Sequence, residues 1–275
     1  MKISVLSENT SLFPEIKEEH GLSLFIQTEK ANILFDMGTG HILKHNTEKL
    51  GVDLSSIDFA VISHGHYDHG GGLPVFLSSN KTALVYICRD AFADLRSRRD
   101  NGEMAYIGLD QKTMSHERLK FVDEQYEIDE NTTIFSNATG TYPRPSENDH
   151  LYVLADQRYI RDDFRHEQHL VLREGNRTLL IAGCAHSGIV NIIEHCNQTI
   201  RITPNAVIGG FHLYNHRTKK SEGADRIAAL AERLLQTQAM FYTGHCTGVE
   251  AYHQLRAIMG DKIQYLSGGR HIQIE

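Results

Sequence analysis

The chain has 275 residues, a hydrophobic fraction of 40% and a formal net charge of -7 with its 17 histidines counted as neutral. This composition can bury one large core, and the acidic balance argues against nucleic acid as a partner. No apolar run reaches the length of a membrane span, and the first residues lack the apolar stretch of a secretory signal, so we expect a cytoplasmic protein without a membrane partner.

The first third of the chain is predicted to form short strands around one helix. Two apolar runs at 23–27 and 32–36 flank a polar turn and predict a β-hairpin. Residues 41–50 are expected to be helical, and 58–63 are expected to form a compact buried strand. A further strand is predicted at 84–88.

Residues 89–165 differ from the rest of the chain, because their charge is dense and their apolar periodicity is weak. We expect one or two strands here, inside an excursion that forms part of an active-site wall. Arg96, Arg98 and Arg99 lie in this segment, and we interpret this run of charge as a solvated face.

The second half predicts alternating strands and helices, beginning with a hairpin at 169–182. Helices are expected at 189–196, 225–236 and 251–259, and strands at 205–210, 240–243 and 263–266. Because strands predominate in each half with helices between them, we predict an α/β fold with two mixed β-sheets packed face to face and helices outside. One domain over residues 1–275 is expected at this length.

The hexapeptide at 64–69 reads His-Gly-His-Tyr-Asp-His and follows a predicted buried strand. Side chains two apart in an extended segment point the same way, so His64 and His66 can hold one metal ion. Asp68 and His69 lie where the loop turns and can face a second ion. Nitrogen and carboxylate ligands favour Zn, Fe or Mn over Ca or Mg.

Three further histidines each follow a predicted buried strand and stand beside Gly or Cys: His186, His212 and His245. Because the carboxyl ends of strands at one sheet edge converge, these imidazoles can reach a shared site. We predict His186 and His245 as metal ligands, whereas His212 is either a ligand or a catalytic group.

These motifs resemble the metallo-β-lactamase superfamily, whose fold is an αββα sandwich with a one- or two-metal site along one edge. The resemblance rests on the hexapeptide and on Ile-Leu-Phe-Asp-Met-Gly at 33–38. It narrows to a subgroup of dihydropteroate-synthase-like, metal-dependent hydrolases at 63–69, 183–192, 209–213 and 244–248. Archaeal members of this subgroup are associated with coupling a dihydropterin diphosphate to an aminobenzene riboside phosphate during methanopterin synthesis.

The resemblance implies a third histidine before a hairpin and a bridging aspartate after it, but here a Gly-Cys pair occupies the aspartate position. Either Cys184 is the bridging or second-site ligand, or His186 contributes together with Glu167 or His166. A thiolate would favour zinc. Asp36 resembles the superfamily's buried aspartate, which orients a metal-binding imidazole without binding metal itself.

Two divalent ions, with zinc favoured over iron or manganese, would activate water for nucleophilic attack. The resemblance then implies that Asp68 holds or orients the nucleophile and that His212 protonates a leaving group or stabilises an oxyanion. Tyr67 and Arg270 are the candidate substrate-binding residues, because a guanidinium suits phosphate.

The favoured function is therefore a metal-dependent hydrolase that acts on a small anionic substrate, a phosphorylated or diphosphate ester. The first alternative is a dihydropteroate-synthase-like transferase that couples a dihydropterin diphosphate to an arylamine. The second is a non-catalytic metabolite sensor on the same fold. The sequence leaves the nucleophile, the native metal, the substrate and the oligomeric state open.

Overall fold

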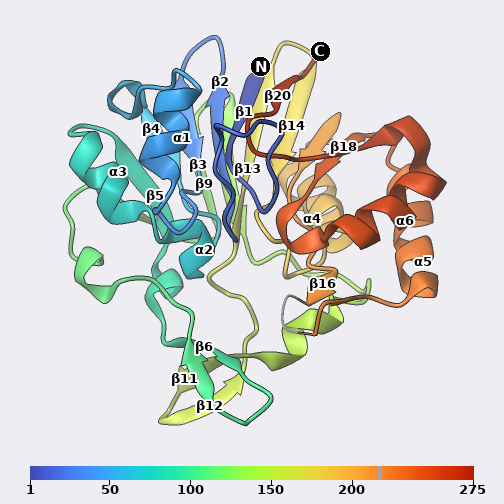
Figure 1. Cartoon of the computed structure of the whole chain (residues 1–275). Coiled ribbons are helices and arrows are strands. Elements are labelled where there is room, and N and C mark those ends of the chain that lie inside the picture. Colours follow the sequence, from blue (N-terminus) through green and yellow to red (C-terminus); the bar gives the residue numbers. More distant parts are fainter. Residues whose placement is uncertain (216–217) are drawn as a thin grey trace.

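A computed structural model describes residues 1–215 and 218–275 of the chain. Two mixed seven-stranded sheets pack face to face at its centre, and helices cover both outer faces (Figure 1). The αββα sandwich predicted from the sequence is therefore confirmed.

The first sheet is parallel from β3 to β8 and antiparallel elsewhere. Its order is β20 (His271–Gln273), β1 (Lys2–Ser7), β2 (Ser23–Gln27), β3 (Asn32–Phe35), β4 (Phe59–Val61), β5 (Leu84–Cys88) and β8 (Leu119–Val122). Helices α1 (Leu43–Lys49) and α3 (Leu73–Ser79) pack on its outer face. The helix predicted at 41–50 is thus confirmed, two residues shorter at its start and one at its end.

The second sheet is parallel from β14 to β19. Its order is β19 (Ile263–Tyr265), β18 (Met240–Thr243), β15 (Ala206–Ile208), β14 (Arg177–Ile181), β13 (Gln168–Glu174), β10 (Thr132–Ser136) and β9 (Gln125–Asp129). Its outer face is covered by α4 (Ile189–His195), α5 (Ala224–Leu235) and α6 (Val249–Met259). In the part of the chain that the structure describes, no helix has the length and apolarity needed to cross a bilayer.

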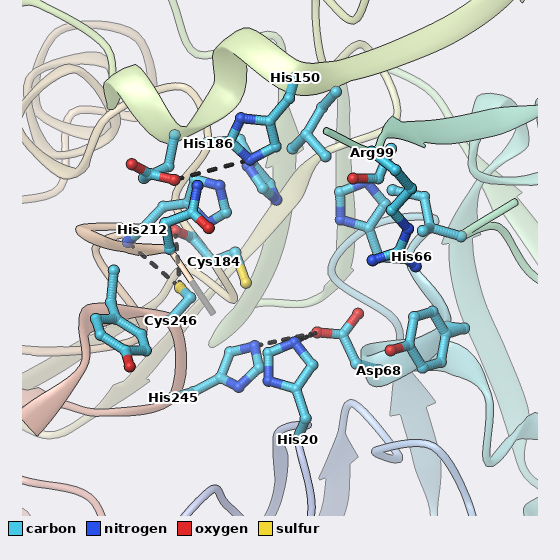
Figure 2. Close-up of a pocket in the computed structure, with 17 residues that line it drawn as sticks. His20, His66, Asp68, Arg99, His150, Cys184, His186, His212, His245 and Cys246 are labelled. Atoms are coloured by element: carbon cyan, nitrogen blue, oxygen red, sulfur yellow. Dashed lines mark hydrogen bonds and ion pairs between the residues drawn. The ribbon is translucent and has the colours of Figure 1, made fainter. Parts of the chain in front are cut away.

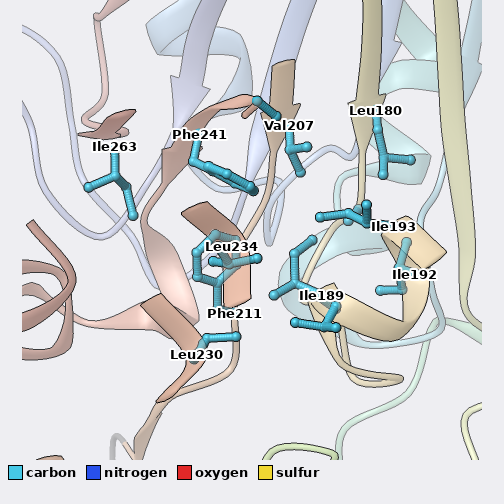
Figure 3. Close-up of a cluster of buried hydrophobic side chains, with 14 of the residues drawn as sticks. Leu180, Ile189, Ile192, Ile193, Val207, Phe211, Leu230, Leu234, Phe241 and Ile263 are labelled. Atoms are coloured by element: carbon cyan, nitrogen blue, oxygen red, sulfur yellow. The ribbon is translucent and has the colours of Figure 1, made fainter. Parts of the chain in front are cut away.

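The central strands are apolar on both faces because each face meets a different layer. In β3, Ile33 and Phe35 belong to the core between the two sheets, whereas Leu34 faces the helices of the first sheet. In the second sheet, Val207 and Phe241 pack against the covering helices (Figure 3). Full burial of one such side chain contributes roughly 1.5–3 kcal/mol, so these layers hold the strand ends firmly in place.

The excursion contains more regular structure than the sequence predicts. Instead of one or two strands, 89–165 contains β6 to β12, and β8, β9 and β10 complete the two main sheets. The others form a four-stranded sheet at one end of the sandwich (Figure 1): β6 (Leu95–Arg98), β7 (Met104–Tyr106), β11 (Leu151–Ala155) and β12 (Arg158–Arg161). The sequence pattern does not predict these strands because they are short and largely exposed to solvent. Every residue of β12 is exposed.

The carboxyl ends of the parallel strands meet at the end of the sandwich that faces the four-stranded sheet, whereas both chain termini lie at the other end (Figure 1). Two short elements complete this region: α2 (Tyr67–Gly70), and the ribbon of β16 (Tyr214–Asn215) and β17 (Lys220–Ser221). Parallel strands place ligands at this edge, and the residues predicted to bind metal follow these strands.

Candidate metal centre

The hexapeptide places two imidazoles against each other directly after β4. His64 Nε2 lies 3.0 Å from His66 Nδ1, and both residues are almost fully buried. The backbone is extended at His66 and then turns into α2, whose first turn contains Asp68. His64 and His66 therefore lie together, and His69 Nε2 lies 3.9 Å from Asp68 Oδ2.

A third imidazole approaches the first pair from the loop after β14. One ring nitrogen each of His64, His66 and His186 lies within 4.8 Å of the other two. Nε2 of His66 and Nε2 of His186 are buried and have no hydrogen-bond partner among the described residues. Buried ring nitrogens without partners are costly unless a ligand is bound, so this set fits a metal ion.

A second group forms around Asp68. Nε2 of His245 lies 3.3 Å from Asp68 Oδ2 and 3.1 Å from Nε2 of His69, and His69 Nε2 lies 3.9 Å from Asp68 Oδ2. His20, which the sequence analysis did not identify, brings its Nε2 to 3.2 Å from Asp68 Oδ2. The sequence does not indicate His20 as a ligand, because it lies in an irregular segment before β2 that matches no metal-binding spacing.

Cys184 lies between the two groups. Its Sγ is 3.0 Å from His69 Nε2, and it belongs to one potential metal-binding set with His64 and His69 and to another with His245 and Cys246. Burial raises the pKa of the Cys184 thiol well above its ordinary value. A thiolate at this position therefore needs a neighbouring cation, which a metal ion would provide.

Glu167 and His166, the alternatives to Cys184 as ligands, bind other groups. The Glu167 carboxylate accepts backbone hydrogen bonds from His186 at 2.6 Å and Ser187 at 2.9 Å. His166 Nε2 lies 3.0 Å from Asp162, and its Nδ1 accepts the backbone N–H of Gly65 at 3.1 Å. The polar atoms of Glu167 and His166 are thus engaged away from the cluster, and Cys184 occupies the position that the resemblance assigns to aspartate.

We call the donors His64, His66, Asp68, His69, Cys184, His186 and His245 the cluster. Three oxygen acceptors orient imidazoles of this cluster. Each lies close to an Nδ1 atom: Asp36 Oδ2 at 2.6 Å from His69, Asn148 Oδ1 at 2.9 Å from His186, and Asn9 Oδ1 at 2.9 Å from His245. Because these oxygens can only accept, each ring carries its proton on Nδ1 and presents Nε2 to the cluster. Asp36 thus occupies the orienting position expected of it, whereas no sequence signal indicated Asn148 or Asn9.

The cluster favours unprotonated rings where no carboxylate adjoins them. Burial is the main cause of a lowered pKa for His64, His66, His186 and His212. Burial alone would also lower the pKa of His69, but Asp36 and Asp68 raise it to about 9. Neutral imidazole is the form that binds a metal.

The cluster forms the floor of a cavity of about 200 Å³ (Figure 2). Tyr67 and His212 line it, and the His212 ring lies 4.3 Å from that of His186, with both of its nitrogens unpaired among the described residues. Arg270 does not line it. Its guanidinium donates to Gln264 and, at 2.9 Å, to the Tyr265 carbonyl, so the structure places Arg270 outside the lining of the cavity where substrate contact was expected.

Residues of the excursion line another part of the cavity wall. Arg99, which follows β6, lines the cavity together with Glu147 and His150 of the turn at 146–150. None of these three was identified from the sequence as a site residue, because no motif includes them.

The sequence and the structure of this chain are both similar to those of known proteins. A family model described as the metallo-beta-lactamase superfamily matches residues 16–189. An uncharacterized protein of Methanocaldococcus jannaschii is 27% identical over 260 residues, which cover 92% of this chain and 93% of the relative. A second protein of that organism is named 7,8-dihydropterin-6-methyl-4-(beta-D-ribofuranosyl)-aminobenzene-5'-phosphate synthase. It is 26% identical over 278 residues, which cover 93% of this chain and 90% of the relative.

Among solved structures, this chain is similar to the crystal structure of a metal-dependent hydrolase of the beta-lactamase superfamily. The TM-score is 0.84 and the identity 27%, and the match covers 100% of this chain and 99% of that chain.

Proposed function

Because this chain belongs to the metallo-β-lactamase superfamily, we propose that it is a metal-dependent hydrolase of small phosphorylated or diphosphate esters. The observation that carries the proposal is the convergence of buried imidazoles, the Asp68 carboxylate and the thiols of Cys184 and Cys246 on a single cavity. The subgroup that the motifs resemble is also confirmed, since the relatives include the named synthase and a metal-dependent hydrolase.

Two divalent ions fit the donor atoms. One would be held by His64, His66 and His186, and the other by Asp68, His69 and His245, with Cys184 in reach of both groups. Nitrogen, oxygen and sulfur donors together favour zinc, with iron or manganese as alternatives. Such ions lower the pKa of water toward neutrality and polarise a phosphoryl oxygen.

The surrounding side chains would complete the chemistry. Asp68 faces the cavity beside His245 and is proposed to orient the nucleophile. Among the described residues, neither ring nitrogen of His212 has a hydrogen-bond partner, so this ring at the cavity wall is proposed to donate a hydrogen bond that stabilises an oxyanion. A cavity of about 200 Å³ suits a small substrate, because it is smaller than pockets that bind drug-sized ligands.

Metal removal tests the proposal. We expect purified protein to contain divalent metal, to lose phosphodiesterase activity on bis(p-nitrophenyl) phosphate after chelation, and to regain it with zinc. His66→Ala should lower metal affinity by more than about tenfold, whereas His41→Ala, an exposed histidine outside the cluster, should leave it unchanged. Full metal content in His66→Ala at wild-type affinity would refute the proposed centre.

A transferase is the second candidate, favoured by the relative named as a synthase. The same site would serve both reactions, with an arylamine replacing water as the nucleophile. Incubation with a dihydropterin diphosphate, with and without an arylamine, separates the two. An adduct whose yield follows metal content would establish the transferase, whereas diphosphate release that is indifferent to the amine would support the hydrolase.

A further inference from the structure

Three arginines of the excursion that the sequence suggests are equivalent have different surroundings. Arg96 pairs with Asp94 at 2.5 Å and lies 5.1 Å from the ring of Tyr106, and Arg98 lies 6.0 Å from the ring of Tyr152. The Arg99 guanidinium has no hydrogen bond or ion pair with any described residue, and this side chain lines the cavity. Arg99 therefore differs from its two neighbours in both partner and position.

Arg99 is the sole arginine or lysine in the cavity lining among residues 1–215 and 218–275. In Figure 2 it lies on the same side of the cavity as His66, with Cys246 and His212 on the opposite side. Its backbone is held at the edge of the four-stranded sheet by a 2.8 Å hydrogen bond from its N–H to the carbonyl of Glu103. The sheet thus fixes a positive charge beside the cluster but outside it.

The neighbouring lining groups suit the same ligand. Tyr67, whose side chain is partly exposed, lies within the electrostatic influence of Arg99 and offers a phenolic hydroxyl. The Glu147 carboxylate also faces the cavity, and its Oε2 lies 3.7 Å from Nε2 of His150. A planar guanidinium with a nearby hydroxyl matches the oxygens of a phosphate or carboxylate.

We propose that Arg99 is a specificity-determining residue that binds a second anionic group of the substrate while the reacting group lies at the imidazole cluster. This inference rests on the proposed function and specifies its substrate class. The substrate is a small molecule with two anionic groups separated by a short spacer, at least one of them a phosphate. A cavity of about 200 Å³ lets one such molecule contact both walls.

Direct binding to the zinc-loaded protein tests the assignment independently of turnover. The probes are propane-1,3-diyl bisphosphate and propyl phosphate, measured by calorimetry. We expect Arg99→Gln to weaken bisphosphate binding by about tenfold to a hundredfold and propyl phosphate binding by less than about threefold, because only the bisphosphate reaches the guanidinium. Arg99→Lys should recover part of the loss, since it restores the charge without the fork.

Arg98→Gln is the matched control, one residue earlier on the same sheet and outside the cavity lining, and should change neither affinity. Equal weakening of both ligands by Arg99→Gln, an unchanged bisphosphate affinity, or failure of the wild type to bind the bisphosphate would each overturn the assignment. If Arg99-dependent binding is observed but no ester is hydrolysed, the proposed hydrolase fails and the anion site stands.

Discussion

At the scale of single residues, Cys184 departs most from what the superfamily resemblance implies. Its thiol lies 3.0 Å from His69 Nε2, between the two groups of donors, at the position where an aspartate is expected. Sulfur is softer than a carboxylate oxygen, so this substitution should tune the site toward zinc. The consequence can be tested on the metal itself.

We expect Cys184→Ser to lower zinc affinity by about tenfold or more and to abolish the thiolate-to-metal charge-transfer absorption of the cobalt-substituted protein. Cys88→Ser is the control, since Cys88 lies at the end of β5 outside the cavity lining. Titration with a competing chelator measures the affinity, and spectra of the cobalt forms report the ligand. An unchanged cobalt spectrum in Cys184→Ser would rule out ligation by Cys184.

At the scale of elements, the strand ends approach closely because glycines follow them. A Cβ atom on Gly210, two residues after β15, would lie 2.3 Å from Cys246 Sγ, and one on Gly183 would lie 2.5 Å from Ser63 Oγ. Gly183 also has φ +55°, which other residues adopt only with strain. The repeated pairing of glycine with histidine in the sequence thus has a steric cause.

Gly210→Ala should therefore displace the Cys246 side chain and lower metal affinity, with a stability loss of about 1–3 kcal/mol from overpacking. Gly223→Ala is its counterpart, because a Cβ there meets nothing within 4 Å and its φ is -60°. Denaturant unfolding of the apo and zinc-loaded forms separates the two effects. Wild-type stability and metal binding in Gly210→Ala would contradict the close-packing explanation.

At the scale of the whole molecule, Glu174 connects the two sheets at the end remote from the cavity. Its carboxylate accepts hydrogen bonds from the Met1 ammonium at 2.8 Å and from the Glu29 backbone at 2.9 Å. Burial alone would raise the pKa of Glu174, but these hydrogen bonds lower it overall. A carboxylate with a lowered folded-state pKa stabilises the fold above its unfolded-state pKa and loses that contribution as pH falls through the folded value.

Glu174→Gln should accordingly reduce the free energy of unfolding by about 1 kcal/mol at pH 7. The difference from the wild type should shrink as the pH falls below about 4. Glu130→Gln is the control, because Glu130 pairs with Lys30 on the surface and its side chain is 75% exposed. Urea unfolding from pH 3 to pH 8 measures both. A difference that persists unchanged at pH 3 would exclude the ionic explanation.

The orienting role expected of Asp36 came from the superfamily resemblance, whereas the sequence by itself determined the layers and the strand-end histidines. These features are local: a strand buried on both faces is a short apolar run, and His-Gly-His places two side chains on one side of one segment. The covering helices were likewise visible from their own periodicity. Each could be predicted because neighbouring residues carry the whole signal.

Only the tertiary structure decided which other side chains reach the cavity. Asn148 meets His186 across 38 residues of sequence and Asn9 meets His245 across 236, while Arg270, expected at the site, is engaged by Tyr265 and Gln264. The sequence does not distinguish Arg99 from the two arginines near it, whereas the four-stranded sheet places Arg99 in the cavity lining. Such contacts depend on how separate elements pack together, and no periodicity within one segment encodes them.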